Sequence, residues 1–500
     1  MNKLNPCVIV IFGASGDLTH LKIFPALFSL WDEKFFPEDF FIVGFARTKM
    51  TDEEFRKTIT QSLNTYCRKK PIDEEDFADF SSRIYYLSSN YDDPESYKIL
   101  NSFINSKAKE YNIPKNIVYY FATPPSIYTV IIENLKDPSL VSDIYKGNGF
   151  IRIVIEKPFG YDYDSAQALN NKLLTIFNEN QIYRIDHYLG KETVQNILAF
   201  RFANAVFEPV WNNKYVDHVQ ISALESIGVG ARAGYFDNAG IIRDMVQNHM
   251  MQLLSLVAIE PPALFDADDI RNEKVKLLKS IRPYSLNDIK DNVVRGQYDR
   301  GFIGSKQVVS YKEENNIPLS SITETYTALK LYIDNYRWAG IPFYLRSGKR
   351  LKTYRTEIAI YFKKLPHSLF GKETVEKIEQ NAIIITIQPN EGIAIKIGAK
   401  SPGFKMQINP VNLEFSYKSS FKLTPPAAYE RLLYDVIEGD QTLFARYDDM
   451  MIAWQFITGI IKGWTKLPKP DFPNYEAGSW GPKEADELLG KDNRVWNNAN

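Results

Sequence analysis

The sequence predicts an N-terminal α/β domain with a mostly parallel sheet, followed by a larger C-terminal α+β domain with a predominantly antiparallel sheet. Two observations predict this organisation. In the first third of the chain, short apolar runs rich in β-branched residues alternate with segments of helical spacing, which is typical of βαβ units. After about residue 210, polar and apolar residues alternate in segments joined by Gly, Pro and Asn. Such alternation indicates antiparallel strands with one solvated face.

Each N-terminal element has its own signal. Uninterrupted or nearly uninterrupted apolar runs predict strands over 8–12, 40–45, 117–122 and 151–155. Helical spacing predicts helices over 21–31 and 51–66. Three acids, Asp52, Glu53 and Glu54, stand at the start of the second helix, where they suit the helix dipole.

The C-terminal part also contains both expected strands and expected helices. Alternating patterns predict strands over 219–223, 323–333, 357–362, 382–387, 393–397 and 411–415. Helices are expected over 241–259 and 440–461. The Pro-rich tail is expected to lie over the surface.

The composition excludes several classes of protein. The chain has 500 residues, 44% of them hydrophobic, so it is not mainly disordered. Its net charge of −1 argues against a nucleic-acid protein that relies on bulk positive charge. Two cysteines, Cys7 and Cys67, exclude a disulfide scaffold and argue against a cysteine-built metal site.

The location expected from the sequence is the cytoplasm. No apolar run reaches the ~18 residues of a membrane-spanning helix, so no membrane partner is expected. The apolar stretch 7–12 could be read as a short signal-peptide core, but it lacks a preceding basic cluster and runs directly into a Gly turn. We interpret it as a buried strand.

The turn after that strand, residues 13–18 (GASGDL), has the spacing of a phosphate-binding loop. Glycines at Gly13 and Gly16 let the backbone approach a pyrophosphate, and the N–H groups of the following helix face the anion. The pattern is shorter than the full GxGxxG fingerprint. The alternative is an ordinary strand-to-helix turn.

The end of the second strand indicates which dinucleotide binds. NAD sites usually place an acid there, whereas the 2′-phosphate of NADP favours Arg. Here the strand is followed by Arg47, Thr48 and Lys49, with no acid. This favours NADP, and the alternative is a solvated basic turn.

A metal-free dehydrogenase needs a base for the hydroxyl proton, and histidine suits that role near neutral pH. Of five histidines, His187 and His249 stand in segments dense in polar groups. On an α-helix Asp244 and His249 would point about 140° apart, so they could not share one face tightly. Each histidine taken alone is more often structural. No spacing suggests metal ligands, so no catalytic metal is expected.

Six motifs, in order along the chain, resemble those of glucose-6-phosphate dehydrogenase. They are GASGDL at 13–18, EKPFG at 156–160, RIDHYLGK at 184–191, GYFDNAGIIRDMVQNHMMQ at 234–252, RSGKRL at 346–351 and YERLLYDVIEGDQTLF at 429–444. The resemblance implies a Rossmann-like coenzyme domain, residues 1–185, and a substrate-binding and oligomerisation α+β domain, residues 186–500. It implies oxidation of glucose 6-phosphate at C1 to the phosphogluconolactone with reduction of NADP, the first step of the pentose phosphate pathway. A homodimer or homotetramer is implied as well.

The resemblance also implies roles for residues at matching positions. His249 matches the general base, and Asp186 matches the carboxylate that orients it. The positions implied to bind substrate are Lys157, His187, Tyr188, Lys191, Glu225, Asp244 and Lys349. The positions implied to bind coenzyme are Gly13, Ser15, Gly16, Asp17, Leu18, Lys22, Arg47 and again Lys157, which matches a residue between substrate and nicotinamide.

One position departs from the family pattern. The family usually has a second basic residue five positions after the lysine matched by Lys349, where this chain has Tyr354 followed by Arg355. Either Arg355 reaches the site through a local shift, or the contact is absent. On a strand, a displacement of one residue turns the side chain to the opposite face.

Two other functions are alternatives to this one. The first is a different Rossmann oxidoreductase that acts on an uncharged substrate. The second is a non-enzymatic binding or structural protein that kept the fold, against which Asp186, His249 and Lys191 argue. Ionisable groups gathered in a pocket have a desolvation cost that function would explain.

Overall fold

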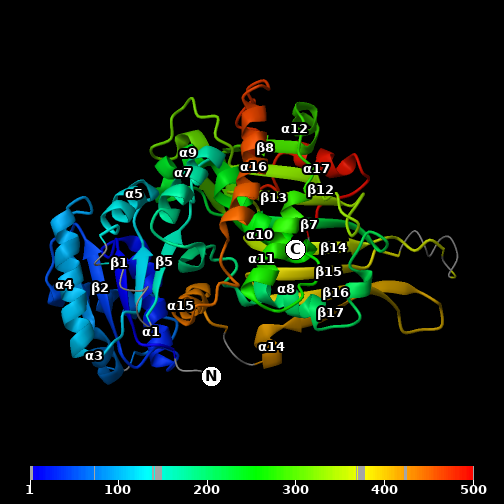
Figure 1. Cartoon of the computed structure of the whole chain (residues 1–500). Coiled ribbons are helices and arrows are strands. Elements are labelled where there is room, and N and C mark those ends of the chain that lie inside the picture. Colours follow the sequence, from blue (N-terminus) through cyan, green and yellow to red (C-terminus); the bar gives the residue numbers. More distant parts are fainter. Residues whose placement is uncertain are drawn as a thin grey trace. The chain divides into compact units, whose positions relative to one another are not determined.

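The computed structural model describes residues 4–72, 74–137, 140, 149–367, 369, 378–421 and 425–498. The chain forms two compact units, and Figure 1 shows their elements. Unit 1 comprises Met1–Gly190, Phe265–Arg271 and Pro426–Asp448; unit 2 comprises Lys191–Leu264, Asn272–Pro425 and Asp449–Asn500. A boundary after residue 185 stays a prediction. Residues 426–448 belong to unit 1 although they lie far along the chain from its N-terminal segment.

Unit 1 contains a six-stranded sheet in which every neighbouring pair is parallel. Its order is β3-β2-β1-β4-β5-β6. The strands are β1 (Cys7–Phe12), β2 (Phe40–Ala46), β3 (Ile84–Ser88), β4 (Ile117–Phe121), β5 (Ile151–Glu156) and β6 (Ile182–Ile185). This is the Rossmann order, in which ligands bind beyond the carboxyl ends of the strands, where the order reverses. The reversal falls between β1 and β4.

The apolar runs predicted these strands because both faces of a parallel sheet are covered. All residues of β1, β2 and β4 are buried. The helical segments around them are η1 (Thr19–Ile23, a π-helix), α1 (Phe24–Asp32), α2 (Asp52–Tyr66), α3 (Glu74–Ser82), α4 (Pro94–Glu110), α5 (Pro125–Asn134), α7 (Tyr163–Leu174), η3 (Glu179–Gln181) and α15 (Ala428–Glu438). Helix α15, orange in Figure 1, packs against α1.

Helix α2 shows how the sequence sets a boundary. The hydroxyl of Thr51 accepts a hydrogen bond from the backbone N–H of Glu54 at 3.2 Å, and the Glu54 carboxylate accepts one from the Thr51 N–H at 2.8 Å. This capping box satisfies two N–H groups that the helix leaves without partners. The helix therefore begins directly after Thr51.

Unit 2 contains an eight-stranded sheet of order β17-β16-β15-β14-β7-β13-β12-β8. The strands are β7 (Val216–Leu224), β8 (Val293–Gly296), β12 (Tyr326–Tyr332), β13 (Pro342–Gly348), β14 (Arg355–Phe362), β15 (Ala382–Gln388), β16 (Gly392–Lys400) and β17 (Ile408–Ser416). Neighbours are antiparallel except β7 and β13, which are parallel. Together the two sheets confirm the expected fold class.

Helices and short strands complete unit 2. They are α8 (Glu192–Phe202), η4 (Glu208–Val210), η5 (Gly230–Arg232), α9 (Ala233–Ile241), the π-helix η6 (Ile242–Met250), α10 (Met251–Ala258), α12 (Leu286–Asn292), β9 (Tyr298–Asp299), β10 (Gly301–Ile303), β11 (Lys306–Val308), η7 (Tyr311–Glu313), α14 (Tyr417–Phe421), β18 (Tyr475–Glu476) and α17 (Lys483–Gly490). Two further helices, α11 (Ala267–Lys279) and α16 (Tyr447–Trp464), have residues in both units. Helix η6 packs on β7 and β13.

The helix expected over 440–461 begins later than the apolar pattern suggests. Helix α15 ends at Glu438, and its C-cap Gly439 has φ +101°, a left-handed conformation that favours glycine. Asp440 then accepts a hydrogen bond from the N–H of Thr442 at 2.8 Å. A side chain that bonds its own neighbouring backbone competes with helix formation, so α16 begins only at Tyr447.

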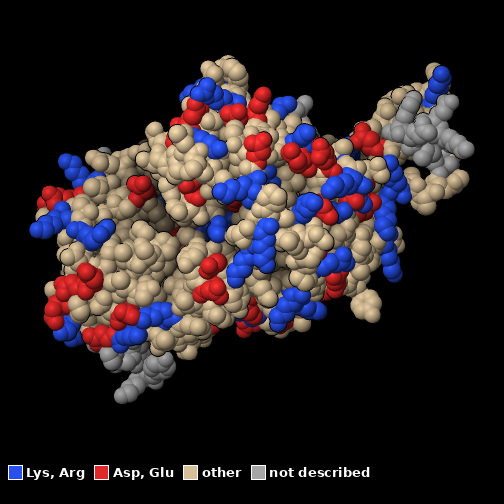
Figure 2. All heavy atoms as spheres, turned by 90° about the horizontal axis from the view of Figure 1, so that it is seen from above, with Lys and Arg blue, Asp and Glu red and all other residues tan. Residues whose placement is uncertain are grey.

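The charges of the surface are mixed. Basic and acidic side chains both occur across the face shown in Figure 2, as the net charge of −1 requires of the chain as a whole. Within the described ranges, none of the helices combines the length and the apolar character needed to cross a bilayer.

Candidate active site

The loop after β1 has a conformation that requires glycine at its start. Gly13 has φ +90°, and a Cβ there would lie 2.5 Å from the carbonyl oxygen of Ala122. The Gly13 carbonyl accepts hydrogen bonds from the Gly16 N–H at 2.9 Å and from the Thr19 hydroxyl at 3.1 Å. The turn is therefore closed tightly on itself and leads into η1. It fits a dinucleotide pyrophosphate, which needs close approach of the backbone.

Arg47 lies immediately beyond β2 at the same sheet edge. Its side chain is exposed, and its guanidinium lies 5.8 Å from the centre of the Tyr91 ring. The hydroxyls of Ser15, in the first loop, and Thr48 are 3.0 Å apart. The exposed cation thus stands beside the turn that a dinucleotide would contact, which fits recognition of a 2′-phosphate.

The ends of β5 and β6 carry the EKPFG and RIDHYLGK motifs to this edge. Lys157 follows the last residue of β5 and is half-buried, and Asp186 follows the last residue of β6 and is only 2% exposed. The Asp186 carboxylate accepts a hydrogen bond from the backbone N–H of Tyr188 at 3.0 Å. The turn after β6 therefore fixes the carboxylate at the carboxyl end of the sheet.

A cavity of about 360 Å³ lies within unit 1 beside this turn. It gathers three of the residues expected in the site, Leu18, Lys22 and His187. Tyr429 and Glu430 of α15 line it as well, so a segment far along the chain completes a pocket of the N-terminal unit. The lining combines apolar residues, such as Leu21 and Pro25, with the polar side chains of Lys22 and His187.

In unit 2, Lys349 and Glu225 come together at the ends of the parallel strands β13 and β7. The Lys349 ammonium donates a hydrogen bond to the Glu225 carboxylate, and the Glu225 N–H donates to the carbonyl of Gly348 at 2.9 Å. Lys349 is 7% exposed. The pairing of β7 with β13 thus positions two of the expected substrate ligands.

Lys191 is the N-cap residue of α8. Its ammonium donates a hydrogen bond to the side-chain oxygen of Gln388, at the end of β15. The sequence contains no signal that singles out Gln388. Its hydrogen bond to Lys191 forms because the eight-stranded sheet brings the end of β15 next to α8.

The helix that carries Asp244 and His249 is a π-helix over Ile242–Met250. The expectation that these two residues point about 140° apart holds for an α-helix and is wrong here. In a π-helix the hydrogen bonds run between residues five apart, and the N–H of Met251 donates to the carbonyl of Val246 in this way. Asp244 and His249 are therefore one turn apart on one side of the helix, 4% and 1% exposed respectively.

The start of this π-helix is held by Glu324. Gly240 has φ +69° and ψ 167°, and a Cβ there would lie 2.2 Å from the Glu324 carboxylate. That carboxylate accepts a hydrogen bond from the Ile242 N–H at 3.3 Å, and the Glu324 carbonyl accepts one from the Ile241 N–H at 3.0 Å. Burial raises the pKa of Glu324.

The position at which the chain departs from the family pattern is also resolved. Tyr354 lies near the side chain of Gln388 and the charge of Glu225, and burial raises the pKa of its hydroxyl. Arg355, the first residue of β14, pairs with the buried Glu357 at 3.1 Å. Whether Arg355 or Tyr354 serves the substrate stays a prediction. Tyr354 lies among the expected substrate ligands of unit 2.

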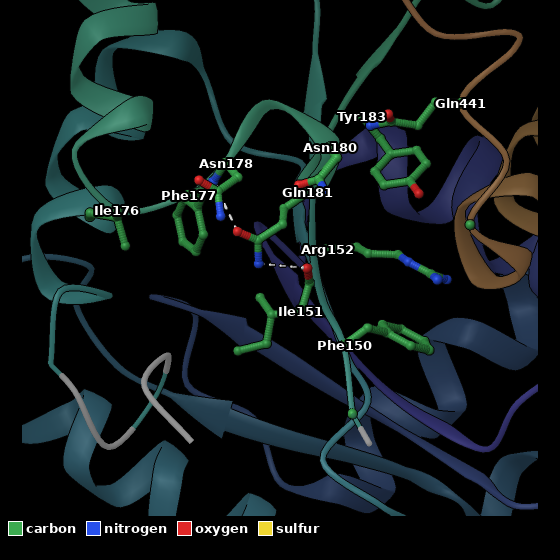
Figure 3. A pocket seen from close by; sticks show the side chains of 12 residues that line it. Phe150, Ile151, Arg152, Ile176, Phe177, Asn178, Asn180, Gln181, Tyr183 and Gln441 are labelled. Atoms are coloured by element: carbon green, nitrogen blue, oxygen red, sulfur yellow. Dashed lines mark hydrogen bonds between the residues drawn. The ribbon is translucent and has the colours of Figure 1, made fainter. Parts of the chain in front are cut away.

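A second cavity in unit 1, about 410 Å³, lies at the opposite end of the sheet. Figure 3 shows Ile151, Arg152 and Tyr183 lining it, at the amino ends of β5 and β6. The Arg152 guanidinium donates hydrogen bonds to the carbonyls of Val436 and Ile437 at 2.7 and 2.6 Å. It thus satisfies the last carbonyls of α15, and the motif residues lie at the other edge.

The fold and the loop define a class of protein. A parallel sheet of Rossmann order, a glycine turn at its reversal point and a buried carboxylate beside a lysine at the same edge are features of a dinucleotide-dependent oxidoreductase.

Comparison with known proteins gives the family. Residues 10–196 match the profile "Glucose-6-phosphate dehydrogenase, NAD binding domain", and residues 198–497 match "Glucose-6-phosphate dehydrogenase, C-terminal domain". The chain belongs to the glucose-6-phosphate dehydrogenase family. This confirms the relationship that the six motifs indicated.

Individual relatives match over nearly the whole chain. The glucose-6-phosphate 1-dehydrogenase of Chlamydia pneumoniae is 47% identical over 497 residues, 98% of this chain and 96% of that protein. A solved glucose-6-phosphate dehydrogenase in complex with its substrate glucose 6-phosphate superposes with a TM-score of 0.89 at 35% identity, over 99% of both chains. The enzyme of Mycobacterium avium superposes with a TM-score of 0.84 at 30% identity, again over 99% of both chains.

Proposed function

We propose that this chain oxidises β-D-glucose 6-phosphate at C1 to 6-phosphoglucono-δ-lactone with NADP as the hydride acceptor, the first step of the pentose phosphate pathway. One observation carries the proposal. In a chain of this family, the Gly13 loop, Lys157 and Asp186 all lie at the carboxyl edge of one Rossmann sheet. That edge is where such sheets bind dinucleotides and their substrates.

The chemistry requires one proton acceptor. We assign His249 as the base that takes the proton of the C1 hydroxyl, and Asp186 as the carboxylate that orients the imidazole and stabilises its charged form. The carbon–hydrogen bond at C1 breaks with its electron pair, and the oxygen left at C1 forms the lactone carbonyl. When bound, NADP supplies the carbon that accepts this hydride.

The phosphate of the substrate calls for cations and hydrogen-bond donors. We assign it to His187, Tyr188 and Lys191. Lys191 is already held in place by Gln388, so binding the phosphate requires little reordering of the side chain.

The sugar needs ligands of its own. We assign its hydroxyls to Glu225 and Asp244, with Lys349 held beside Glu225. Lys157 is placed between substrate and nicotinamide. These assignments explain why buried charged side chains are kept in the protein at a desolvation cost.

The coenzyme is assigned to the loop of Gly13, Ser15, Gly16, Asp17 and Leu18, together with Lys22, Arg47 and Lys157. Arg47 would hold the 2′-phosphate that distinguishes NADP from NAD. Its exposed guanidinium beyond β2 supports this.

We further propose that the protein acts in the cytoplasm as a homodimer or homotetramer and has no nucleic-acid or membrane partner. Strand β17, at the edge of the eight-stranded sheet, supports the assembly, because Val411 and Leu413 on it are 40% and 56% exposed. Sedimentation equilibrium at micromolar concentration tests it. A monomer at all concentrations would contradict it.

The function is tested by a matrix of NADP and NAD against glucose 6-phosphate and glucose, read as absorbance of the reduced coenzyme. We expect turnover with glucose 6-phosphate and NADP, and turnover with glucose lower by at least a hundredfold. Equal rates with both sugars would indicate an oxidoreductase for uncharged substrates. No reduction with any combination would indicate a non-enzymatic member of the fold.

A further inference from the structure

The glutamate of the EKPFG motif, Glu156, is the centre of a buried polar cluster in unit 1. It is the last residue of β5 and is 8% exposed. The hydroxyl of Tyr120, on β4, donates to one of its carboxyl oxygens at 2.5 Å, and the hydroxyl of Tyr429, on α15, donates to the same oxygen at 3.1 Å. The hydroxyl of Tyr128, on α5, donates to its backbone carbonyl at 3.0 Å.

This cluster lies next to the residues assigned to catalysis. Lys157 is the next residue in the chain, and the charges of Lys157 and Asp186 both act on the Glu156 carboxyl. The groups that face Glu156 are thus Tyr120, Tyr128 and Tyr429, one lysine and one aspartate, contributed by β4, α5, α15 and the ends of β5 and β6. A carboxyl this deeply buried has a desolvation cost, and nothing in the proposed mechanism yet uses it.

We propose that Glu156 is a positioning residue of the active site, which sets the charge beside Asp186 and through it the proton affinity of the base. The inference rests on the proposed function, because it acts through the role assigned there to Asp186. Glu156 itself touches neither substrate nor coenzyme in this assignment. Its carboxyl acts at the edge of the sheet, through the field of its charge.

The cluster makes the charge of Glu156 variable near neutral pH. Burial raises its pKa to about 7, and the two tyrosine hydroxyls and Lys157 oppose that rise. Below this pH the carboxyl is neutral, and above it a negative charge stands beside Asp186. A nearby negative charge favours the protonated imidazole. The wild-type acid limb of kcat/KM therefore lies at a higher pH than it would without Glu156.

The test is the pH dependence of kcat/KM for glucose 6-phosphate in Glu156→Gln. Both tyrosine hydroxyls donate to the same carboxyl oxygen, so the glutamine oxygen can keep both hydrogen bonds while the charge is lost. We expect the midpoint of the acid limb to shift to lower pH by about 0.5 unit. When the kcat/KM of each enzyme is divided by its own plateau value, the variant should then exceed wild type by about threefold at a pH on the acid limb.

Two tyrosine variants separate charge from structure. Tyr120→Phe removes a donor from the carboxylate, which makes ionisation of Glu156 harder, so the limb shifts in the same direction by a smaller amount. Tyr128→Phe is the matched control, because its hydroxyl bonds only the backbone carbonyl of Glu156. It removes a buried hydroxyl of the same cluster and leaves the midpoint unchanged.

The outcomes distinguish this inference from the proposed function. If wild-type protein reduces no coenzyme with glucose 6-phosphate, the proposed function has failed. If wild type is active but Glu156→Gln and Tyr120→Phe keep the wild-type midpoint, Glu156 is only structural and the inference is overturned. A shift of equal size in Tyr128→Phe would also overturn it, since the effect would then come from general loosening of the cluster. A midpoint that moves in the first two variants alone supports it.

Discussion

Asp244 and His249 lie one turn apart in a helix whose hydrogen bonds join residues five apart. An α-helix would have turned them away from each other. The sequence spacing of five is therefore consistent with a base and a sugar ligand on the same side of one helix. Wider helical turns are rare and often occur at functional sites. The conformation of this segment, and not its residue types alone, supports the assignment of His249.

Replacing that histidine tests the assignment directly. We expect His249→Asn to lower kcat by about a hundredfold or more with little change in substrate Kd, because a positioned base contributes about 10²–10⁴ to the rate. His218→Asn is the control, since His218 is also buried but pairs with Asp217 at 2.7 Å and stacks on Tyr361. The control should lose thermal stability and keep its kcat within a few-fold. Near-normal turnover in His249→Asn would remove it as the base.

Gly240→Ala tests whether the anchor of the π-helix matters. The positive φ and the 2.2 Å approach to Glu324 mean that a methyl group forces a change in the backbone. We expect a loss of about 2 kcal/mol or more in the free energy of unfolding and a fall in kcat, measured by denaturation and steady-state kinetics. Gly234→Ala, in the same helix α9 with open space around its Cβ position, should keep both. Equal behaviour of the two variants would show that Glu324 does not anchor the helix.

The strands of the coenzyme sheet were predictable where both faces are buried and the run is apolar. Strand β6 was not predicted, because it has only four residues and includes Arg184. The structure explains how an arginine can be buried there: it donates to Glu179 at 2.5 Å and to Asn170 at 2.6 Å. These partners lie outside the strand, so the periodicity of its own four residues could not reveal that Arg184 is buried.

Some site residues could likewise be predicted from local sequence patterns, and others could not. Gly13 and Arg47 follow predicted strands, so local patterns were enough to single them out. Tyr429 and Gln388 were not singled out, because each becomes part of a site only through a contact distant in sequence, Tyr429 with Glu156 and Gln388 with Lys191. The π-helix was not predictable either, since no simple residue pattern distinguishes it from an α-helix.

Tyr354 takes the place of a basic residue of the family pattern and lies near Gln388, the residue that accepts a hydrogen bond from Lys191. We expect Tyr354→Phe to raise the KM for glucose 6-phosphate by about threefold to tenfold with little change in kcat, the cost of one hydrogen bond. Arg355→Gln should leave that KM unchanged but lower the melting temperature, because Glu357 is buried and loses its cation. The opposite result, with KM rising only in Arg355→Gln, would restore Arg355 as the substrate ligand.

Arg47→Ala tests the choice of coenzyme. A guanidinium that binds the 2′-phosphate contributes nothing to NAD, so we expect the KM for NADP to rise by about tenfold or more while the KM for NAD stays within twofold. Lys57→Ala removes a charge of the same sign from an exposed position of α2 and should change neither value. An equal rise for both coenzymes in Arg47→Ala would assign the arginine to a part that they share.

The stability of the protein should report the ionisation of Glu156 without any assay of activity. Its pKa of about 7 lies above the ordinary value of 4.5, mainly because the carboxyl is buried. The folded state therefore holds the proton more tightly than the unfolded state, and this contribution to stability is complete below about pH 4.5 and is lost as the pH rises through 7. Across that window the loss is on the order of 3 kcal/mol. Glutamine does not ionise, so Glu156→Gln lacks this loss. In calorimetric scans, the melting temperature of the variant should therefore rise relative to that of wild type as the pH increases from about 5 to about 8. In Tyr128→Phe the difference from wild type should stay constant with pH, and the same constancy in Glu156→Gln would mean that the carboxyl does not titrate in this range.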